Sequence, residues 1–71
     1  MNKIPQFMTR YHNKIFDRIF NDKTANYEEK DEAIRKIYKA TTGYQLGILT
    51  EDEAMKMLVE TSIDWNARGK E

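Results

Sequence analysis

The sequence predicts an all-α fold of three helices, with the last two forming an antiparallel helical hairpin. Three observations predict it. Apolar residues recur at spacings of three and four, two segments begin with helix-capping sequences, and a glycine separates the second helical pattern from the third. We expect helices over residues 5–21, 27–46 and 51–66 of a single small domain of 71 residues, with residues 67–71 frayed.

The first helix begins at the only proline of the chain, Pro5. Proline suits the first turn of a helix, where its missing N–H leaves no hydrogen bond unmade. The apolar stripe that follows consists of Met8, Tyr11, Ile15 and Ile19, and it is widened by Phe7, Phe16 and Phe20. The polar residues 21–26 are typical of a turn and end this helix.

The second helix has a cap at Asn26, with Glu29 as the reciprocal partner of a capping box. Thr24 is a competing cap. Acidic residues occupy the first turns and basic residues follow, an order that suits both the helix dipole and pairs four residues apart. Gly43 lies inside the helix at a cost of about 1 kcal/mol relative to alanine. We therefore expect a close approach by another helix at Gly43, or a bend.

The hairpin joint is predicted at Gly47, where the chain turns left-handed after a helix. Ile48 is expected to fold back on the last turn of the second helix. Thr50 and Glu53 have the spacing of a second capping box. The first turn of the third helix is acidic, which the helix dipole favours.

The chain has 12 basic and 12 acidic residues, so its formal net charge is zero. This balance disfavours nucleic-acid binding by bulk charge. The charges form blocks, since residues 22–34 hold five acids against two lysines and residues 35–50 hold three bases and no acid. Such blocks favour the packing of neighbouring segments or neighbouring copies. Small domains often gain stability from self-association, so a homo-oligomer is among the expected states.

The sequence lacks the residues that several kinds of functional site require. No cysteine is present, which excludes disulfides and cysteine-based zinc sites. His12 is the only histidine, and the acids around Asp52 lack the spacing of a calcium loop. The glycines do not form a phosphate-binding loop. We therefore predict a non-enzyme without metal or cofactor.

The apolar runs fall well short of the ~20 residues that span a bilayer, and the N-terminal segment lacks the apolar region of a signal peptide. The predicted location is cytoplasmic, with no membrane partner.

The aromatic content is the main functional signal, with four tyrosines, three phenylalanines and one tryptophan. Aromatic side chains are favoured in interface cores and at binding hot spots, and a three-helix domain of this size covers only part of them. Trp65 and either Phe16 or Phe20 are the expected exposed anchors, with core filling as the alternative. The predicted partner-binding residues are Phe16, Phe20, Tyr44 and Trp65. They predict a protein–protein interaction module, a regulatory or inhibitory adaptor that binds a protein partner or itself.

The alternative function is a small DNA-binding regulator. Arg10, Lys14 and Arg18 lie four residues apart on one face of the first helix. That face is either a phosphate-binding surface or a solvated face that pairs with the acidic blocks. The third helix begins with acids, which phosphates would repel, so it is a poor recognition helix. The predicted nucleic-acid residues are Arg10, Lys14, Arg18, Arg35, Lys36 and Lys39.

Residues 32–60 resemble the short bacterial helical modules known as SHOCT domains. The matching residues are Gly47, Ile48, Leu49, Thr50, Asp52, Glu53 and Leu58. The sequence departs from the pattern after Glu53, where the family usually has an aromatic residue and then lysines. The resemblance implies a module that mediates association and supplies no catalytic residues. Similar hairpins are frequent in small accessory proteins of phages and mobile elements, which makes such a source a further hypothesis.

Overall fold

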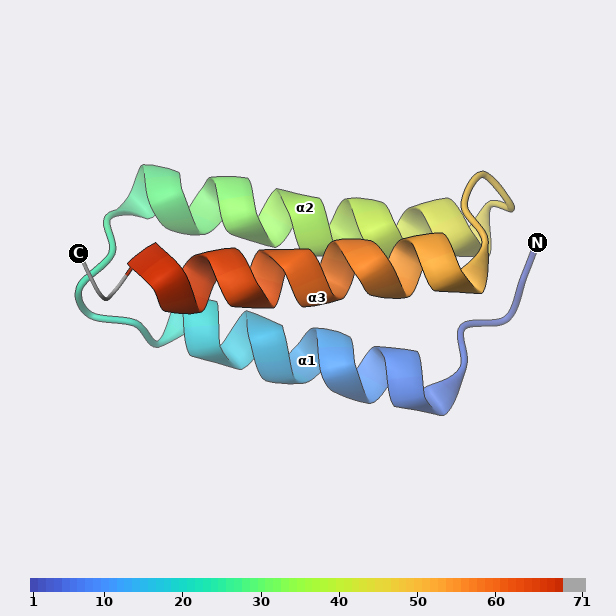
Figure 1. Cartoon of the computed structure of the whole chain (residues 1–71), viewed down its shortest axis with the longest axis horizontal. Coiled ribbons are helices and arrows are strands. Elements are labelled where there is room, and N and C mark those ends of the chain that lie inside the picture. The colour runs from blue at the N-terminus through green and yellow to red at the C-terminus, as the bar shows by residue number, and fades with distance from the viewer. Residues whose placement is uncertain (69–71) are drawn as a thin grey trace.

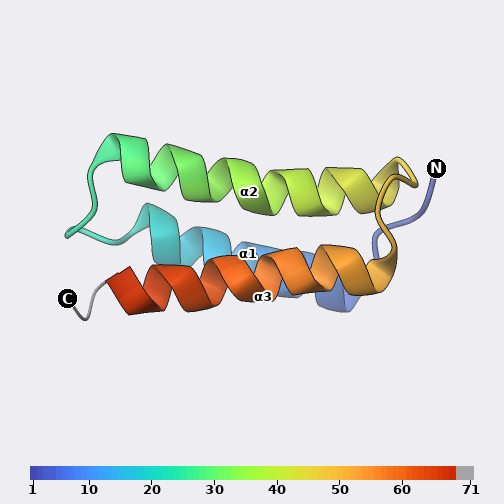
Figure 2. The ribbon, with the colours of Figure 1, turned by 45° about the horizontal axis from the view of Figure 1, so that its top comes forward.

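The computed structural model describes residues 1–68, and it is all-α with three helices, as predicted. Helix α1 covers Gln6–Phe20, α2 covers Tyr27–Gln45 and α3 covers Glu51–Arg68. The helices run side by side in an elongated molecule of 38 × 18 × 17 Å (Figure 1). α2 and α3 share the most extensive contact, consistent with the predicted hairpin. Turning the molecule shows α1 lying along the hairpin formed by the other two helices (Figure 2).

The core is contributed by all three helices. Its largest fully covered side chains are Met8 and Ile19 of α1, Ile37 of α2 and Leu58 of α3. Three alanines are also buried, Ala33 and Ala40 of α2 and Ala54 of α3. Because alanine is small, these positions let neighbouring helices approach closely. Burial of this apolar surface is the main stabilising contribution to the fold.

Both capping boxes are confirmed. The backbone N–H of Glu29 donates to Asn26 Oδ1 at 2.8 Å, and the Asn26 N–H donates to Glu29 Oε1 at 3.2 Å. Thr24 is therefore not the cap. Its N–H and hydroxyl donate to Asp22 Oδ1 instead, at 2.9 and 2.6 Å. At the start of α3, the Glu53 N–H donates to Thr50 Oγ1 at 3.1 Å and the Thr50 N–H donates to Glu53 Oε1 at 2.9 Å.

The joint turns at Gly47, whose φ is 79°, as predicted. The Ile48 N–H donates to the Gly43 carbonyl at 2.8 Å and the Gly47 N–H donates to the Tyr44 carbonyl at 3.0 Å. This pair of bonds is the Schellman motif that ends many helices. The bonds satisfy carbonyls that the end of α2 would otherwise leave unpaired.

Two expectations at the joint need correction. Ile48 does not fold back on α2, since its side chain is 73% exposed. Leu49 packs there instead. A Cβ atom on Gly43 would lie only 2.7 Å from Leu49 Cδ1, so the close approach at Gly43 comes from this loop side chain and not from another helix.

Both ends of the described chain hold structure beyond the predicted helices. Asn2 forms two hydrogen bonds with α2. Its backbone N–H donates to the Gln45 carbonyl at 2.8 Å, and its Nδ2 donates to the Tyr44 carbonyl at 3.1 Å. Residues 67 and 68 were expected to fray, but they belong to α3. The remainder of that prediction, residues 69–71, lies outside the described residues. Within residues 1–68 no helix has both the length and the apolar character needed to cross a membrane.

Candidate functional site

Three aromatic side chains in contact follow the seam between α1 and α2, and we call Phe16, Phe20 and Tyr38 the aromatic strip. The rings of Phe16 and Phe20 stack with centroids 5.7 Å apart. The rings of Phe16 and Tyr38 meet edge to face at 6.4 Å. Phe20 is 59% exposed and Tyr38 is 51% exposed, whereas Phe16 is half-buried beneath them.

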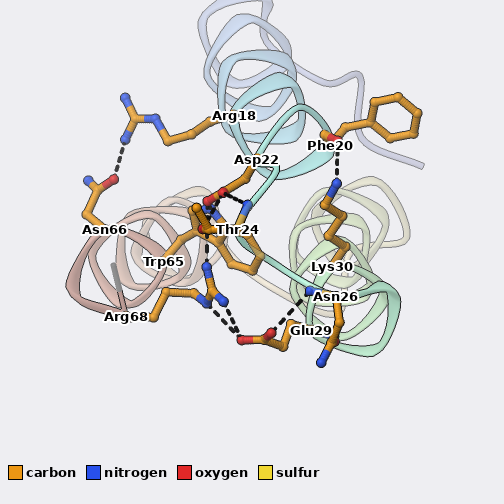
Figure 3. Close-up of polar contacts among 10 residues, drawn as sticks. All are labelled: Arg18, Phe20, Asp22, Thr24, Asn26, Glu29, Lys30, Trp65, Asn66 and Arg68. Atoms are coloured by element: carbon orange, nitrogen blue, oxygen red, sulfur yellow. Dashed lines mark hydrogen bonds and ion pairs between the residues drawn. The ribbon is translucent and has the colours of Figure 1, made fainter. Parts of the chain in front are cut away.

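Helical spacing produces the strip. Phe16 and Phe20 are four residues apart on α1, so their side chains lie one above the other on the same face. Lys30 Nζ donates to the carbonyl of Phe20 at 2.8 Å and so ties the end of α1 to α2 (Figure 3). These constraints hold the rings in place without covering them.

Charged side chains pair beside the strip on α2. Arg35 Nε donates to Asp31 Oδ2 at 2.8 Å, and this hydrogen bond together with the Asp31 charge raises the pKa of Arg35. The pair balances its own charge. The surface around the aromatic strip is therefore not dominated by either sign.

His12 continues the strip toward the interior. Its ring meets that of Tyr38 edge to face at 4.9 Å, and only 8% of the residue is exposed. Nδ1 lies 3.3 Å from Asn13 Oδ1, but Nε2 is buried with no hydrogen-bond partner among the described residues. An unpaired buried polar atom is unusual in a native fold and calls for a reason.

Trp65 is not the exposed anchor that was expected. It is only 7% exposed, and its Nε1 donates to Asp22 Oδ2 at 3.0 Å (Figure 3). The guanidinium of Arg68 lies 4.6 Å from the centroid of the Trp65 ring. Arg68 also donates to Glu29 Oε2 at 2.6 and 2.9 Å. The alternative, that Trp65 fills the core, is correct, and we call Asp22, Glu29, Trp65 and Arg68 the polar lock.

Carboxylates in the lock and caps have lowered pKa values. The Thr24 hydroxyl, followed by the Thr24 N–H, lowers the pKa of Asp22. The Asn26 N–H is the largest cause of the lowered pKa of Glu29, and Arg68 adds to it. The Thr50 N–H lowers the pKa of Glu53. In each case a hydrogen bond favours the charged form.

Of the predicted partner-binding residues, only Phe20 is largely exposed. Phe16 and Tyr44 are half-buried and pack against the core. Tyr38, which is 51% exposed, was not among the predicted partner-binding residues. Its neighbours in the sequence held a signal, since Tyr27, Asp31 and Arg35 share its flank of α2 at helical spacing.

Two of the three predicted nucleic-acid residues of α1, Lys14 and Arg18, lie beside α3. Arg18 Nη1 donates to Asn66 Oδ1 at 2.8 Å (Figure 3). Lys14 and Arg18 also line a small groove with Ser62 of α3. Arg10 is exposed on the same helix.

The predicted nucleic-acid residues of α2 lie elsewhere. Lys36 and Lys39 line a groove between α2 and α3 together with Glu60 and Asp64. Lys36 Nζ is 3.8 Å from Glu32 Oε1, and Arg35 pairs with Asp31. Lys14 and Arg18 thus line one groove beside α3 and Lys36 and Lys39 line another, whereas Arg35 lies on the flank of α2 that carries Tyr38. The structure does not join all six residues into one surface.

A second apolar surface lies at the hairpin joint. The groove there has a volume of about 220 Å³. Leu46 and Ile48 are 54% and 73% exposed beside it. It is lined by Lys39, Thr42, Gly43, Leu46, Ile48, Leu49 and Met57.

No group of three His, Cys, Asp or Glu side chains within residues 1–68 is arranged to hold a metal ion. No known protein family, curated protein or solved structure matches the chain. The resemblance of residues 32–60 to SHOCT domains therefore stays a prediction.

Proposed function

We propose that this chain is a small cytoplasmic protein–protein interaction module, a regulatory or inhibitory adaptor without catalytic activity. The observation that carries the proposal is the exposure of the aromatic strip. Phe20 and Tyr38 present more than half of their surface to water while contacting one another through Phe16. Tyrosine and other aromatic residues supply much of the binding energy at protein interfaces. The strip is the surface that we assign to the partner.

The strip is also preorganised. Its rings stack on one another, and each is carried by a helix instead of a loop. A side chain that is already held in place loses little conformational entropy on binding. This favours the strip over the exposed Ile48 of the hairpin joint, which lies in a loop.

A small DNA-binding regulator is the second candidate. Arg10 and Lys14 favour it, because both are exposed and neither has an acidic partner within residues 1–68. The net charge of zero and the separation of the two basic sets weigh against it. Non-specific nucleic-acid affinity grows with the number of phosphates that a protein neutralises.

A pull-down with paired variants tests the proposal. Tagged wild-type protein and a Phe20→Ala/Tyr38→Ala variant are incubated with lysate of the organism that encodes the chain, with and without nuclease, and bound proteins are identified by mass spectrometry. A Phe7→Ala/Ile63→Ala variant is the control, since it removes exposed apolar side chains outside the strip.

We expect at least one protein to be retained by the wild type and the control and lost by the strip variant, regardless of nuclease. Equal recovery by all three proteins would contradict the role of the strip. Recovery that disappears with nuclease, and with Arg10→Ala/Lys14→Ala, would replace the proposal with the DNA-binding function.

A further inference from the structure

One flank of α2 carries four exposed side chains in a row, Tyr27, Asp31, Arg35 and Tyr38. Their spacings of four, four and three residues place them on one stripe of a helix. Tyr27 is 80% exposed and Tyr38 is 51% exposed. The side chains of Arg35 and Asp31 are 79% and 40% exposed. We call these four residues the α2 stripe.

The α2 stripe on one copy of the chain is complementary to the same stripe on a second copy that runs in the opposite direction. Read from either end it is an aromatic residue, two charged residues and an aromatic residue, with the acid in one half and the base in the other. In an antiparallel copy of α2, Asp31 faces Arg35 of the second copy while Tyr27 faces Tyr38. Both pairings centre on the same turn of α2, midway between Asp31 and Arg35, so a single two-fold axis satisfies them. This is the reciprocal pairing of a two-fold symmetric interface, in which each contact occurs twice.

We propose that a second copy of this chain binds to the α2 stripe, with the two α2 helices antiparallel and a two-fold axis that crosses the stripe midway between Asp31 and Arg35. This inference rests on the proposed function, because Tyr38 belongs to both the aromatic strip and the α2 stripe. It specifies the partner of that surface as the chain itself.

The extent of the contact decides how stable such a dimer is. A contact over a whole long side of the molecule, a rectangle of 38 by 18 Å or about 700 Å², would be comparable with the ~800 Å² per partner of a standard stable interface. The α2 stripe covers only part of that side. The aromatic side chains supply apolar area at both ends of the stripe, and Phe16 and Phe20 extend it onto α1.

The charges fix how the two α2 helices are aligned along each other in the dimer. Asp31 and Arg35 are 2.8 Å apart within one copy. In the dimer, two such pairs form a cluster of four alternating charges. Isolated surface pairs contribute little, whereas networks of charges and like-charge mismatches discriminate between arrangements.

Charge reversal tests this arrangement. Asp31→Arg places two arginines opposite each other in the symmetric dimer, and Arg35→Asp places two aspartates opposite each other. Each variant alone is expected to dimerise at least about tenfold more weakly than wild type, because like charges face each other across the interface. An equal mixture of the two variants restores both opposite-charge contacts and is expected to form a heterodimer. The measurement is sedimentation equilibrium of each variant and of the mixture, with circular dichroism to verify helicity.

The same helix provides a matched control. Glu32 and Lys36 also form an acid–base pair four residues apart, but both line the groove that faces α3. Glu32→Arg and Lys36→Asp make the same charge changes outside the α2 stripe. Their dimerisation is expected to match that of the wild type, and mixing them is expected to change nothing.

A wild-type protein that is monomeric up to its highest soluble concentration would overturn the dimer. So would reversal variants that fail to recombine on mixing, or control variants that lose dimerisation equally. These outcomes are distinct from failure of the proposed function. A monomeric wild type that still retains a protein through Phe20 and Tyr38 would refute only the self-association.

Discussion

The two seams that α2 makes, with α3 and with α1, differ in the side chains that build them. The seam with α3 includes buried alanines, and at its joint end Gly43 makes room for the loop side chain of Leu49. Capping boxes, the Schellman motif and the polar lock complete it. The seam with α1 carries the aromatic strip and buries His12, whose Nε2 lacks a partner among the described residues.

This difference divides the side chains that stability explains from those that it does not explain. Every polar group described above at the hairpin caps, joint or lock has a hydrogen-bond partner that explains its presence. Along the seam with α1, Phe20 and Tyr38 leave apolar surface in water, and His12 Nε2 is buried without a hydrogen-bond partner among the described residues. Side chains that stability does not explain are candidates for function. Mutations in the first group should lower stability more than mutations in the second group.

The largest effect is expected for Trp65→Ala in the polar lock. Removing a buried tryptophan side chain lowers the free energy of unfolding by about 3–5 kcal/mol, which is comparable with the whole stability that a core of this size supplies. Thermal melts followed by circular dichroism measure it. Trp65→Phe keeps an aromatic ring but loses the bond to Asp22 and part of the buried volume, so its melting temperature should lie between those of Trp65→Ala and the wild type. A Trp65→Ala protein with the same melting temperature as the wild type would contradict the stabilising role of the polar lock.

Gly47→Val at the joint is expected to cost about 1–2 kcal/mol, because a β-branched residue resists the left-handed conformation. Gly47→Asn is the matched control, since asparagine tolerates that conformation better. No atom lies within 4 Å of a Cβ at Gly47, so the cost reports backbone strain alone. Equal unfolding midpoints in urea for the two variants would show that the joint does not require positive φ.

His12→Leu is expected to change stability in the opposite direction, raising the free energy of unfolding by about 1 kcal/mol. Replacing an unsatisfied buried polar group with an apolar one removes its desolvation penalty. Urea denaturation measures the change, and the exposed Asn13→Ala variant is the control for loss of the contact to Nδ1. A clear loss of stability in His12→Leu would mean that the imidazole is satisfied in solution.

Acid should weaken the hairpin caps and lock. The pKa values of Asp22, Glu29 and Glu53 are lowered in the folded protein from ordinary values of 3.8 for Asp and 4.5 for Glu. The unfolded chain therefore binds protons first as pH falls. The stability that these groups contribute is complete above the ordinary values and is lost as pH falls through the lowered ones. Melting temperatures from about pH 6 to pH 3 should fall, and less steeply in Glu29→Gln. A slope unchanged by that substitution would exclude Glu29 as a contributor.

The smallest effect on stability is expected for Phe20→Ala, within about 0.5 kcal/mol of wild type, as is usual for exposed positions. Phe20 is 59% exposed, and its truncation opens no cavity. The same thermal melts as for Trp65→Ala make the comparison direct. A loss approaching that of Trp65→Ala would place Phe20 in the core and remove the basis of the aromatic strip.

Local signals in the sequence were sufficient for the helices. Asn26, Thr50 and their partner glutamates act within one turn, and Gly47 acts through its own backbone, so their roles follow from spacing alone. Trp65 could not be placed this way, because its partner Asp22 is 43 residues distant in sequence.

The joint shows the same limit at shorter range. Which of Ile48 and Leu49 packs on α2 depends on the path of the chain after the Schellman motif. The burial of His12 depends on its contact with Tyr38 of another helix. The sequence therefore predicted the helices, the surplus of aromatic residues and Phe20 as a candidate for exposure, but it misplaced Trp65 and omitted Tyr38.

The odd number of helices has a mechanical consequence. Asn2 is hydrogen-bonded to the end of α2 beside the hairpin joint, whereas α3, which ends at Arg68, ends toward the opposite end of the long axis (Figure 1). Tension applied between these residues would run parallel to the helices and load both seams in shear, so many side-chain contacts would bear the force together. Inserted between two other proteins, residues 2–68 would act as a spacer of about 38 Å, the length of the molecule.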